Sequence, residues 1–197
     1  MSDRAPCRII WPGTAVLCLL ASTVISACSE SSPAQLEDAG TGDAVPTIDF
    51  EPEGEGGPGM IWLRLAEADP AAGTFSLEVV GDGLASVYGV AGRLLFDTGV
   101  CALESAAPGG ALEGGAAVVI AAGAGNGEGG VFGVSRSGDF SAGADLAADA
   151  VVGTLSFRIV QPGSTEIRFK ENRSRAMSPS LEKVEVADWL GGTLTAE

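Results

Sequence analysis

The feature that most constrains the fold is a series of short apolar segments, from residue 60 onward, separated by glycine-rich turns. The segments 151–159 and 165–170 alternate apolar with polar residues, and 75–79 is a third case. This period of two predicts strands with one buried face. We expect the inward residues to be Val151, Leu155, Phe157, Ile159, Ile167 and Phe169. Repeated short strands of this kind are typical of an antiparallel sandwich.

Other segments of residues 60–197 have the composition of strands and turns rather than of long helices. Further strands are expected at 61–65, 87–96, 117–121, 131–135, 184–186 and 193–195. Only residues 144–150 favour a short helix. The fold class predicted is therefore all-β, with residues 60–197 forming a single domain large enough for one sandwich core.

Charge and composition exclude several functions. The chain has 26 acidic and 11 basic side chains, for a formal net charge of −15. Such a chain is repelled by nucleic acid, so we expect no nucleic-acid partner. It contains no histidine, which excludes Ser-His, Cys-His and His-metal chemistry. No pair of carboxylates stands out for glycoside hydrolysis. We therefore expect no enzymatic activity, no catalytic residue and no cofactor.

The N-terminal segment has the layout of a secretory signal. Arg4 and Arg8 precede an uncharged stretch over 9–29 with a short apolar centre. Polar residues weaken the second half of this stretch, which disfavours a permanent membrane span.

The end of that stretch, Ile25-Ser26-Ala27-Cys28, resembles the bacterial lipobox. The resemblance implies that residues 1–27 are a lipoprotein signal peptide and that Cys28 is the lipid attachment site. Several acyl chains would make a stable membrane anchor. Ser29 then implies sorting to the outer membrane, so the expected location is extracytoplasmic and lipid-anchored to the cell envelope. An ordinary signal with an incidental cysteine stays open.

Residues 28–59 are acidic and rich in serine, glycine and proline, and the stretch has no basic residue. A segment of this kind buries too little apolar surface to fold, and its like charges extend it. We predict a disordered tether over 28–59.

Three segments of the domain, Gly89–Asp97, Val152–Phe157 and Trp189–Thr195, resemble strands of cohesin modules in their order and spacing. The resemblance covers residues 60–197. It implies a jelly-roll sandwich of about nine strands that binds a dockerin-like protein and performs no chemistry. Thr98 stands where the family usually has proline. Cys101 stands near a usual leucine, and we interpret it as a small buried core residue.

Other motifs are weaker. The glycine-rich segment 123–130 lacks the lysine and following helix of a phosphate loop and predicts a hairpin connection. Four acidic residues offer oxygen ligands for calcium, but their spacing does not match a calcium loop, and we predict no metal site. These residues are Glu128, Asp139, Asp145 and Asp149.

Three aromatic residues are candidates for a sugar-binding platform: Trp62, Tyr88 and Trp189. The sequence alone thus predicts a lipid-anchored binding module that recognises a dockerin-like protein in a polysaccharide-related surface system. A direct carbohydrate-binding domain and a structural envelope lipoprotein without a ligand are the alternatives. The sequence does not identify the ligand-binding residues.

Overall fold

The computed structural model describes residues 46–112, 115–121, 129–137 and 142–197, and every structural statement below concerns these residues. They form strands and two single-turn 3-10 helices, η1 and η2. The strands are β1 (Ile48–Pro52), β2 (Met60–Asp69), β3 (Thr74–Gly81), β4 (Leu84–Val87), β5 (Gly89–Leu95), β6 (Cys101–Pro108), β7 (Ala116–Ala121), β8 (Gly130–Ser135), β9 (Ala144–Leu146), β10 (Ala150–Ile159), β11 (Gly163–Phe169), β12 (Arg175–Met177), β13 (Lys183–Val184), β14 (Asp188–Leu190) and β15 (Gly192–Ala196). The helices are η1 (Gly110–Leu112) and η2 (Glu171–Arg173).

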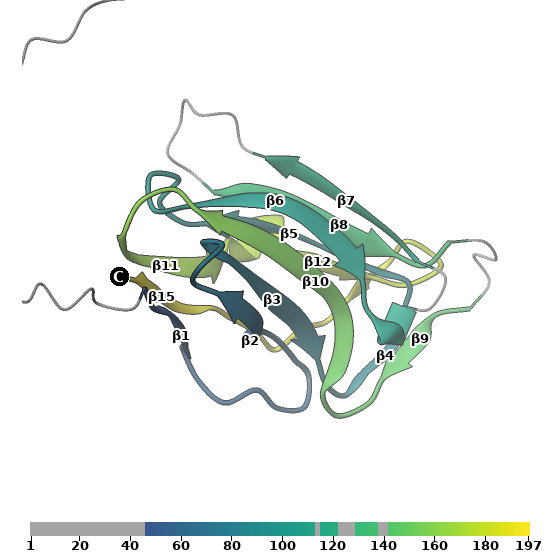
Figure 1. Cartoon of the computed structure of the whole chain (residues 1–197). Coiled ribbons are helices and arrows are strands. Elements are labelled where there is room, and N and C mark those ends of the chain that lie inside the picture. The colour runs from purple at the N-terminus through teal and green to yellow at the C-terminus, as the bar shows by residue number, and fades with distance from the viewer. Residues whose placement is uncertain (1–45, 113–114, 122–128, 138–141) are drawn as a thin grey trace, which may run out of the picture. The chain divides into compact units, whose positions relative to one another are not determined.

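The strands build two layers (Figure 1). The smaller sheet has five strands in the order β14-β2-β3-β10-β6. The larger sheet has eight strands, in the order β1-β15-β11-β5-β12-β13, with β8 pairing to β5 and β7 pairing to β8. A ribbon of β4 and β9 lies at one end of the sandwich. The strands pair antiparallel, except that β14 runs parallel to β2. The predicted antiparallel sandwich is confirmed.

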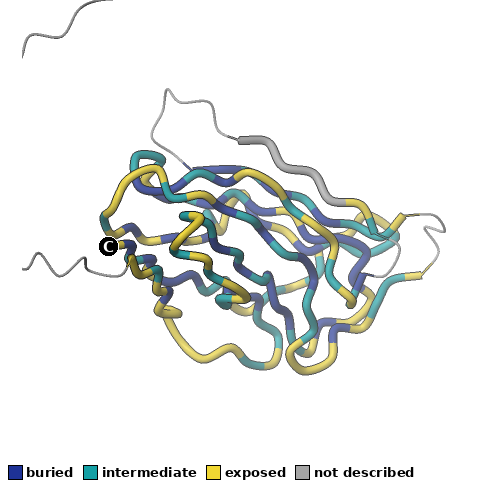
Figure 2. The backbone as a smooth tube through the Cα atoms, viewed as in Figure 1, coloured by how far each residue is buried: buried dark blue, intermediate teal, exposed yellow. Residues whose placement is uncertain are grey.

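The core lies between the two layers, where Figure 2 shows the buried stretches of both sheets facing each other. Aromatic rings fill its centre. Phe75 and Phe157 stack with ring centroids 4.9 Å apart, and Phe96 meets Phe157 edge-on at 5.6 Å. Such pairs stabilise a core beyond the apolar area they bury. Aromatic contacts also join the layers elsewhere, since Phe169 of β11 meets Trp189 of β14.

The predicted inward faces of two strands are confirmed with one exception. Leu155 and Phe157 in β10 are buried, as are Ile167 and Phe169 in β11. Val151 is only half-buried, because a β-bulge between Val151 and Gly153 shifts the register. The bulge turns Val152 into the core instead.

Ile159, also predicted to face inward, is half-buried at the end of β10 and packs against the core.

The sandwich begins before residue 60, which corrects the predicted limit of the tether at 59. Residues 48–52 form β1, which pairs with β15 along its whole length. Phe50 is buried opposite Leu194, and Gly192 two residues along β15 leaves room for its ring, since a Cβ at Gly192 would collide with it. The charge of this stretch misled the prediction because Asp49 and Glu51 flank Phe50 and point to solvent. Residues 28–45 lie outside the described residues.

Two further expectations change. The short helix predicted at 144–150 is wrong, since Ala144–Leu146 is strand β9, paired to β4 and anchored by buried Leu146. The closing strand expected at 189–195 is divided by Gly191 into β14 and β15, which belong to different sheets. Within the described residues the strand segments outnumber the nine expected, because the chain breaks several strands in this way.

Candidate functional site

The arginines on the outer face of the smaller sheet are paired with carboxylates of neighbouring strands. Arg64 on β2 donates to Glu78 on β3, with Nη2 and Oε2 2.7 Å apart. Arg158 on β10 donates to Glu104 on β6, with Nε and Oε1 2.8 Å apart. Cross-strand pairs of this kind are characteristic of a solvated sheet face.

The outer face of the larger sheet has a floor of small residues. Ala91 on β5 stands opposite Gly133 on β8 and opposite Arg175 on β12. Directly opposed residues share a face, and the alternate residues Val90 and Val134 are buried in the core. The surface over Ala91 and Gly133 is therefore recessed, because neither residue has a large side chain.

A hollow of about 400 Å³ lies above this floor. We call it the hollow. Its outward lining is mostly apolar and comes from strands β5, β7, β8 and β12 and from the turn after β12: Ala91, Ala116, Gly133, Ser135, Met177 and Leu181. An apolar concavity on a sheet face is suited to receive a side chain of another molecule.

Leu181 forms the edge of the hollow and is unusually placed. Its side chain is 71% exposed, and its φ is +64°. The backbone conformation at this position is one that glycine adopts most readily. The turn between β12 and β13 thus exposes a large apolar side chain, although the left-handed backbone conformation at this position disfavours any residue with a Cβ.

Basic side chains also lie on this outer face. Arg93 shares it with Ala91, since the two are separated by one residue in β5, and Arg168 stands opposite Leu95. Arg175 stands opposite Ala91. We call Arg93, Arg168 and Arg175 the basic rim. Among the residues that the structure describes, Arg168 and Arg175 form no ion pair.

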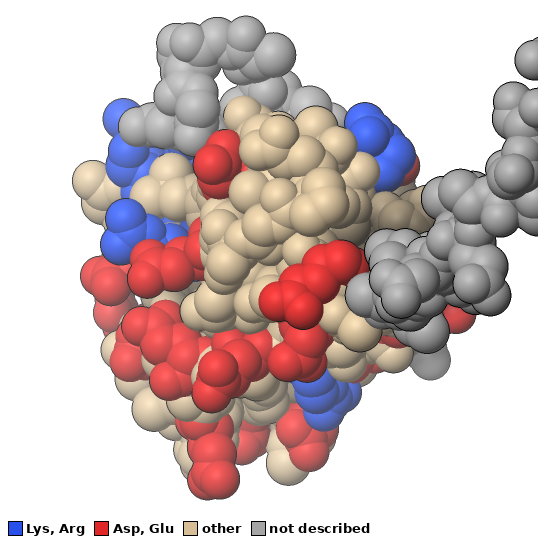
Figure 3. All heavy atoms as spheres, turned by 60° about the vertical axis from the view of Figure 1, so that its left-hand side comes forward, with Lys and Arg blue, Asp and Glu red and all other residues tan. Residues whose placement is uncertain are grey.

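The basic rim contrasts with the chain as a whole. The formal net charge is −15, and Figure 3 shows acidic side chains gathered over much of one side of the molecule, with basic ones in a few separate groups. On this face Arg175, opposite Ala91, adds a positive charge to an acidic molecule, whereas Arg168 lies in a pocket with Glu51, Glu53 and Glu166. A positive charge beside the hollow favours a negative group on the partner.

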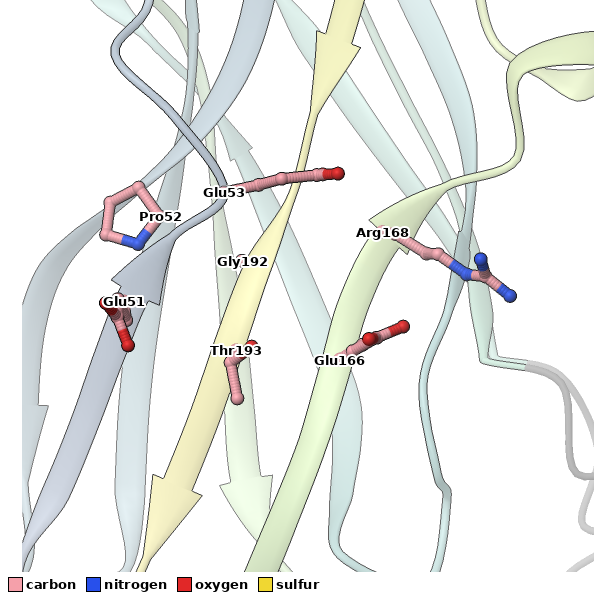
Figure 4. A pocket seen from close by; sticks show the side chains of 7 residues that line it. All are labelled: Glu51, Pro52, Glu53, Glu166, Arg168, Gly192 and Thr193. Carbon is pink, nitrogen blue, oxygen red and sulfur yellow. The ribbon is translucent and has the colours of Figure 1, made fainter.

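The other end of this outer face is acidic and polar. A pocket of about 430 Å³ is lined there by β1, β15 and β11, with Glu51, Glu53 and Glu166 around Thr193 (Figure 4). Arg168 extends from β11 away from β15. Glu53 accepts a hydrogen bond from the backbone N–H of Gly191 at 3.2 Å. Within the described ranges no group of three or more His, Cys, Asp or Glu residues is placed to hold a metal ion.

Cys101 is fully buried on β6, which confirms its interpretation as a core residue. Burial raises the pKa of its thiol to about 12, and the nearby charge of Asp97 adds to the shift. A thiol of this kind is a poor nucleophile at neutral pH.

The three aromatic residues named as candidates for a sugar platform do not form one. Trp62 and Tyr88 are each only 8% exposed, and Gly56 lies against the Trp62 ring. Trp189 packs on Phe169, with ring centroids 5.1 Å apart. Trp189 stands opposite Ile61, the neighbour of Trp62, so the two tryptophans occupy opposite faces of the smaller sheet.

The remaining motifs fall partly outside the described residues. Asp145 accepts a hydrogen bond from the N–H of Ser86 at 2.9 Å, and Asp149 lies 3.5 Å from Arg64. Glu128 and Asp139 lie outside the described residues, as does Cys28.

The loop part of 123–130 also lies outside them, but its flanking strands β7 and β8 pair antiparallel, which confirms the hairpin connection. No helix of the described residues is both long enough and apolar enough to cross a membrane.

The comparisons with known proteins concern the fold. No protein-family model matches the chain, and no curated protein sequence does. Among solved structures, the sixth cohesin of scaffoldin B from Acetivibrio cellulolyticus, crystallised with a dockerin, is similar with a TM-score of 0.51 at 14% identity, over 68% of this chain and 95% of that one.

Two further cohesin structures are similar over comparable lengths. A non-cellulosomal cohesin of Archaeoglobus fulgidus has a TM-score of 0.49 at 16% identity, over 68% of this chain and 87% of that one. A type I cohesin of Clostridium thermocellum in a dockerin complex has a TM-score of 0.48 at 13% identity, over 72% and 96%. The fold of this chain is cohesin-like, as the sequence resemblance implied.

Sequence reasoning missed the hollow. Ala91 and Gly133 are unremarkable small residues, and they become neighbours only because β5 pairs with β8. The one available signal was Leu181, an isolated leucine in the polar stretch 178–183.

Proposed function

We propose that this chain is a protein-binding module that recognises a dockerin-like protein through the outer face of its larger sheet. The observation that carries the proposal is the hollow together with Arg175 of the basic rim, which stands opposite Ala91 at the floor. Apolar contact in the hollow would supply affinity, and the rim would supply orientation and register. The similar cohesin from Acetivibrio cellulolyticus was crystallised with a dockerin, which supports a partner of this kind.

The partner should have a chemistry complementary to this face. An apolar side chain would enter the hollow, and an acidic group beside it would face Arg175. Because the rest of the chain is acidic, a partner with negative charge spread over its whole surface would be repelled elsewhere. We therefore propose a local acidic patch around an apolar centre.

We further propose that the module is held at the cell envelope, in a polysaccharide-related surface system. Acylated Cys28 would hold it to the outer membrane, and the acidic residues after Cys28 would act as a spacer. The lipobox resemblance of residues 25–28 supports this part of the proposal. Cys28→Ser should move the protein from the membrane fraction to the soluble extracytoplasmic fraction, and retention in the membrane would contradict the anchor.

The binding function is tested with residues 46–197, which include β1, as bait on envelope extract of the native cell. A captured protein is then purified and titrated against the bait in a calorimeter. We expect a one-to-one complex that Gly133→Leu abolishes and that the smaller-sheet variant Ser76→Leu leaves intact. A structural lipoprotein without a ligand would capture no specific protein, and a carbohydrate-binding domain would give a signal on a glycan array.

A further inference from the structure

The turn between β12 and β13 is a three-residue hairpin loop that holds Leu181 in a fixed position. The N–H of Leu181 donates to the carbonyl of Ser178, and the N–H of Ser178 donates to the carbonyl of Glu182, both at 2.9 Å. Loops of this length place their third residue in the left-handed conformation, which is usually occupied by glycine. The residue here is Leu181, with φ +64°.

Further hydrogen bonds brace the same turn. The N–H of Glu182 donates to Ser178 Oγ at 3.2 Å, and Ser180 Oγ donates to Glu182 Oε2 at 3.1 Å. The backbone that carries Leu181 is thus held on both sides. Its side chain remains 71% exposed, so core packing does not account for a leucine at a glycine position. Strain kept at an exposed position is a reason to look for a binding role.

The floor of the hollow has a matching property. A Cβ built on Gly133 would have the Ala91 Cβ as its nearest neighbour at 3.9 Å, which is ordinary contact. The fold would therefore accept a side chain at 133. By contrast, a Cβ on Gly89 in the same face would come within 3.0 Å of the Ser135 Cβ and the Val134 carbonyl. The absence of a side chain at Gly133 keeps the hollow open without serving the packing of the sheet.

We infer that Leu181 is a preformed apolar anchor, and that it and the hollow together bind an aliphatic or aromatic side chain that stands beside a carboxylate on the partner. This inference rests on the proposed function and names the chemistry of its contact. The carboxylate would meet Arg175, which stands opposite Ala91 at the floor. Because the turn is already ordered, little conformational entropy is lost when the partner binds.

The test uses anilinonaphthalene sulfonate, a probe that joins an aromatic group to an anion, and the full chain with Cys28→Ser so that no acyl group competes for it. We expect saturable fluorescence enhancement from one site. Leu181→Asn should weaken binding roughly tenfold, since the anchor is lost while asparagine tolerates the backbone. Gly133→Leu should abolish binding, Arg175→Gln should weaken it, and Leu181→Met should retain it.

The matched control is Val160→Asn, because Val160 is the other large apolar side chain exposed in the described residues, at 48%, and it follows β10 of the smaller sheet. Binding to this variant should equal that of the parent. Each variant must show the parent's circular dichroism spectrum. The inference is overturned if the parent shows no saturable binding. It is also overturned if Leu181→Asn and Gly133→Leu bind the probe as tightly as the parent does. Its failure is separable from that of the proposed function, because the probe needs no protein partner and the calorimetric titration needs no probe.

Discussion

The two outer faces of the sandwich handle charge and apolar surface in opposite ways. On the smaller sheet, Arg64 and Arg158 are each paired with a glutamate across the strands. On the larger sheet, Arg168 and Arg175 form no ion pair with any described residue, and Leu181 in the turn after β12 is exposed. Both faces belong to the same fold and rest on the same core. The difference teaches that a binding face is recognised by groups that the fold itself leaves unmatched.

The comparison also separates two kinds of concavity. The smaller sheet carries a depression of about 420 Å³ with a mixed polar and apolar lining, which includes Glu67, Asp69, Glu104 and nearby serine and threonine residues. The hollow on the larger sheet has nearly the same volume but a mostly apolar lining. Water hydrates the carboxylates and hydroxyls of the first depression, whereas the apolar lining of the hollow offers water few hydrogen bonds. The volumes of the two concavities therefore do not distinguish the faces, whereas the chemistry of the residues that line them does.

The largest expected effect concerns the core between the two sheets. Phe157→Ala removes the ring that joins Phe75 to Phe96 and should lower the free energy of unfolding by about 3–5 kcal/mol. Urea unfolding measures the change, and Phe157→Leu should lose less because it leaves a smaller cavity. A loss below about 1 kcal/mol would show that the two layers do not share one core.

The next effect concerns Cys101 on the smaller sheet. Burial raises the pKa of its thiol from 9.0 to about 12, so the stability that the neutral thiol allows is complete below pH 9 and falls as the pH rises. At pH 10.5 the loss should be about 2 kcal/mol relative to pH 8. Cys101→Ala should lack this part of the alkaline loss.

Urea unfolding of residues 46–197 at the two pH values measures this difference, since Cys101 is the only cysteine in that range. An identical alkaline loss in parent and variant would contradict the assignment. Thiol reagents should react with the folded parent only after unfolding.

A smaller effect concerns the exposed turn of the larger sheet. Leu181→Gly relieves the left-handed backbone and should raise the free energy of unfolding by about 1 kcal/mol. The same change should weaken probe and partner binding, which would demonstrate that stability is given up for recognition. Leu181→Ala is the control, because it keeps the backbone strain. A gain in stability without loss of binding would remove Leu181 from the binding face.

The smallest effects distinguish the arginines of the two faces. Arg158→Gln breaks an exposed pair and should change the free energy of unfolding by less than about 1 kcal/mol, without effect on binding. Arg175→Gln should leave stability unchanged and weaken binding in a salt-dependent way. Calorimetry at low and high salt measures both variants. If both arginines affected binding equally, the distinction between the faces would fail.

The sequence by itself determined the class of fold. Period-two alternation in 151–159 and 165–170 placed Leu155, Phe157, Ile167 and Phe169 in the core, because strand geometry alone sends alternate residues to opposite faces. Local rules were misled where tertiary packing took over. The bulge that buries Val152 and the pairing of β1 with β15 both depend on partners far away in the chain.

Only the tertiary structure decided where the candidate site lies. Ala91, Gly133 and Arg175 are distant in sequence and meet because β5 pairs with both β8 and β12. No local pattern encodes that meeting, since strand order is set by the burial of whole faces and not by the residues that end up outside. The lipobox at Cys28 is the opposite case, because a linear motif of neighbouring residues needs no fold to be recognised.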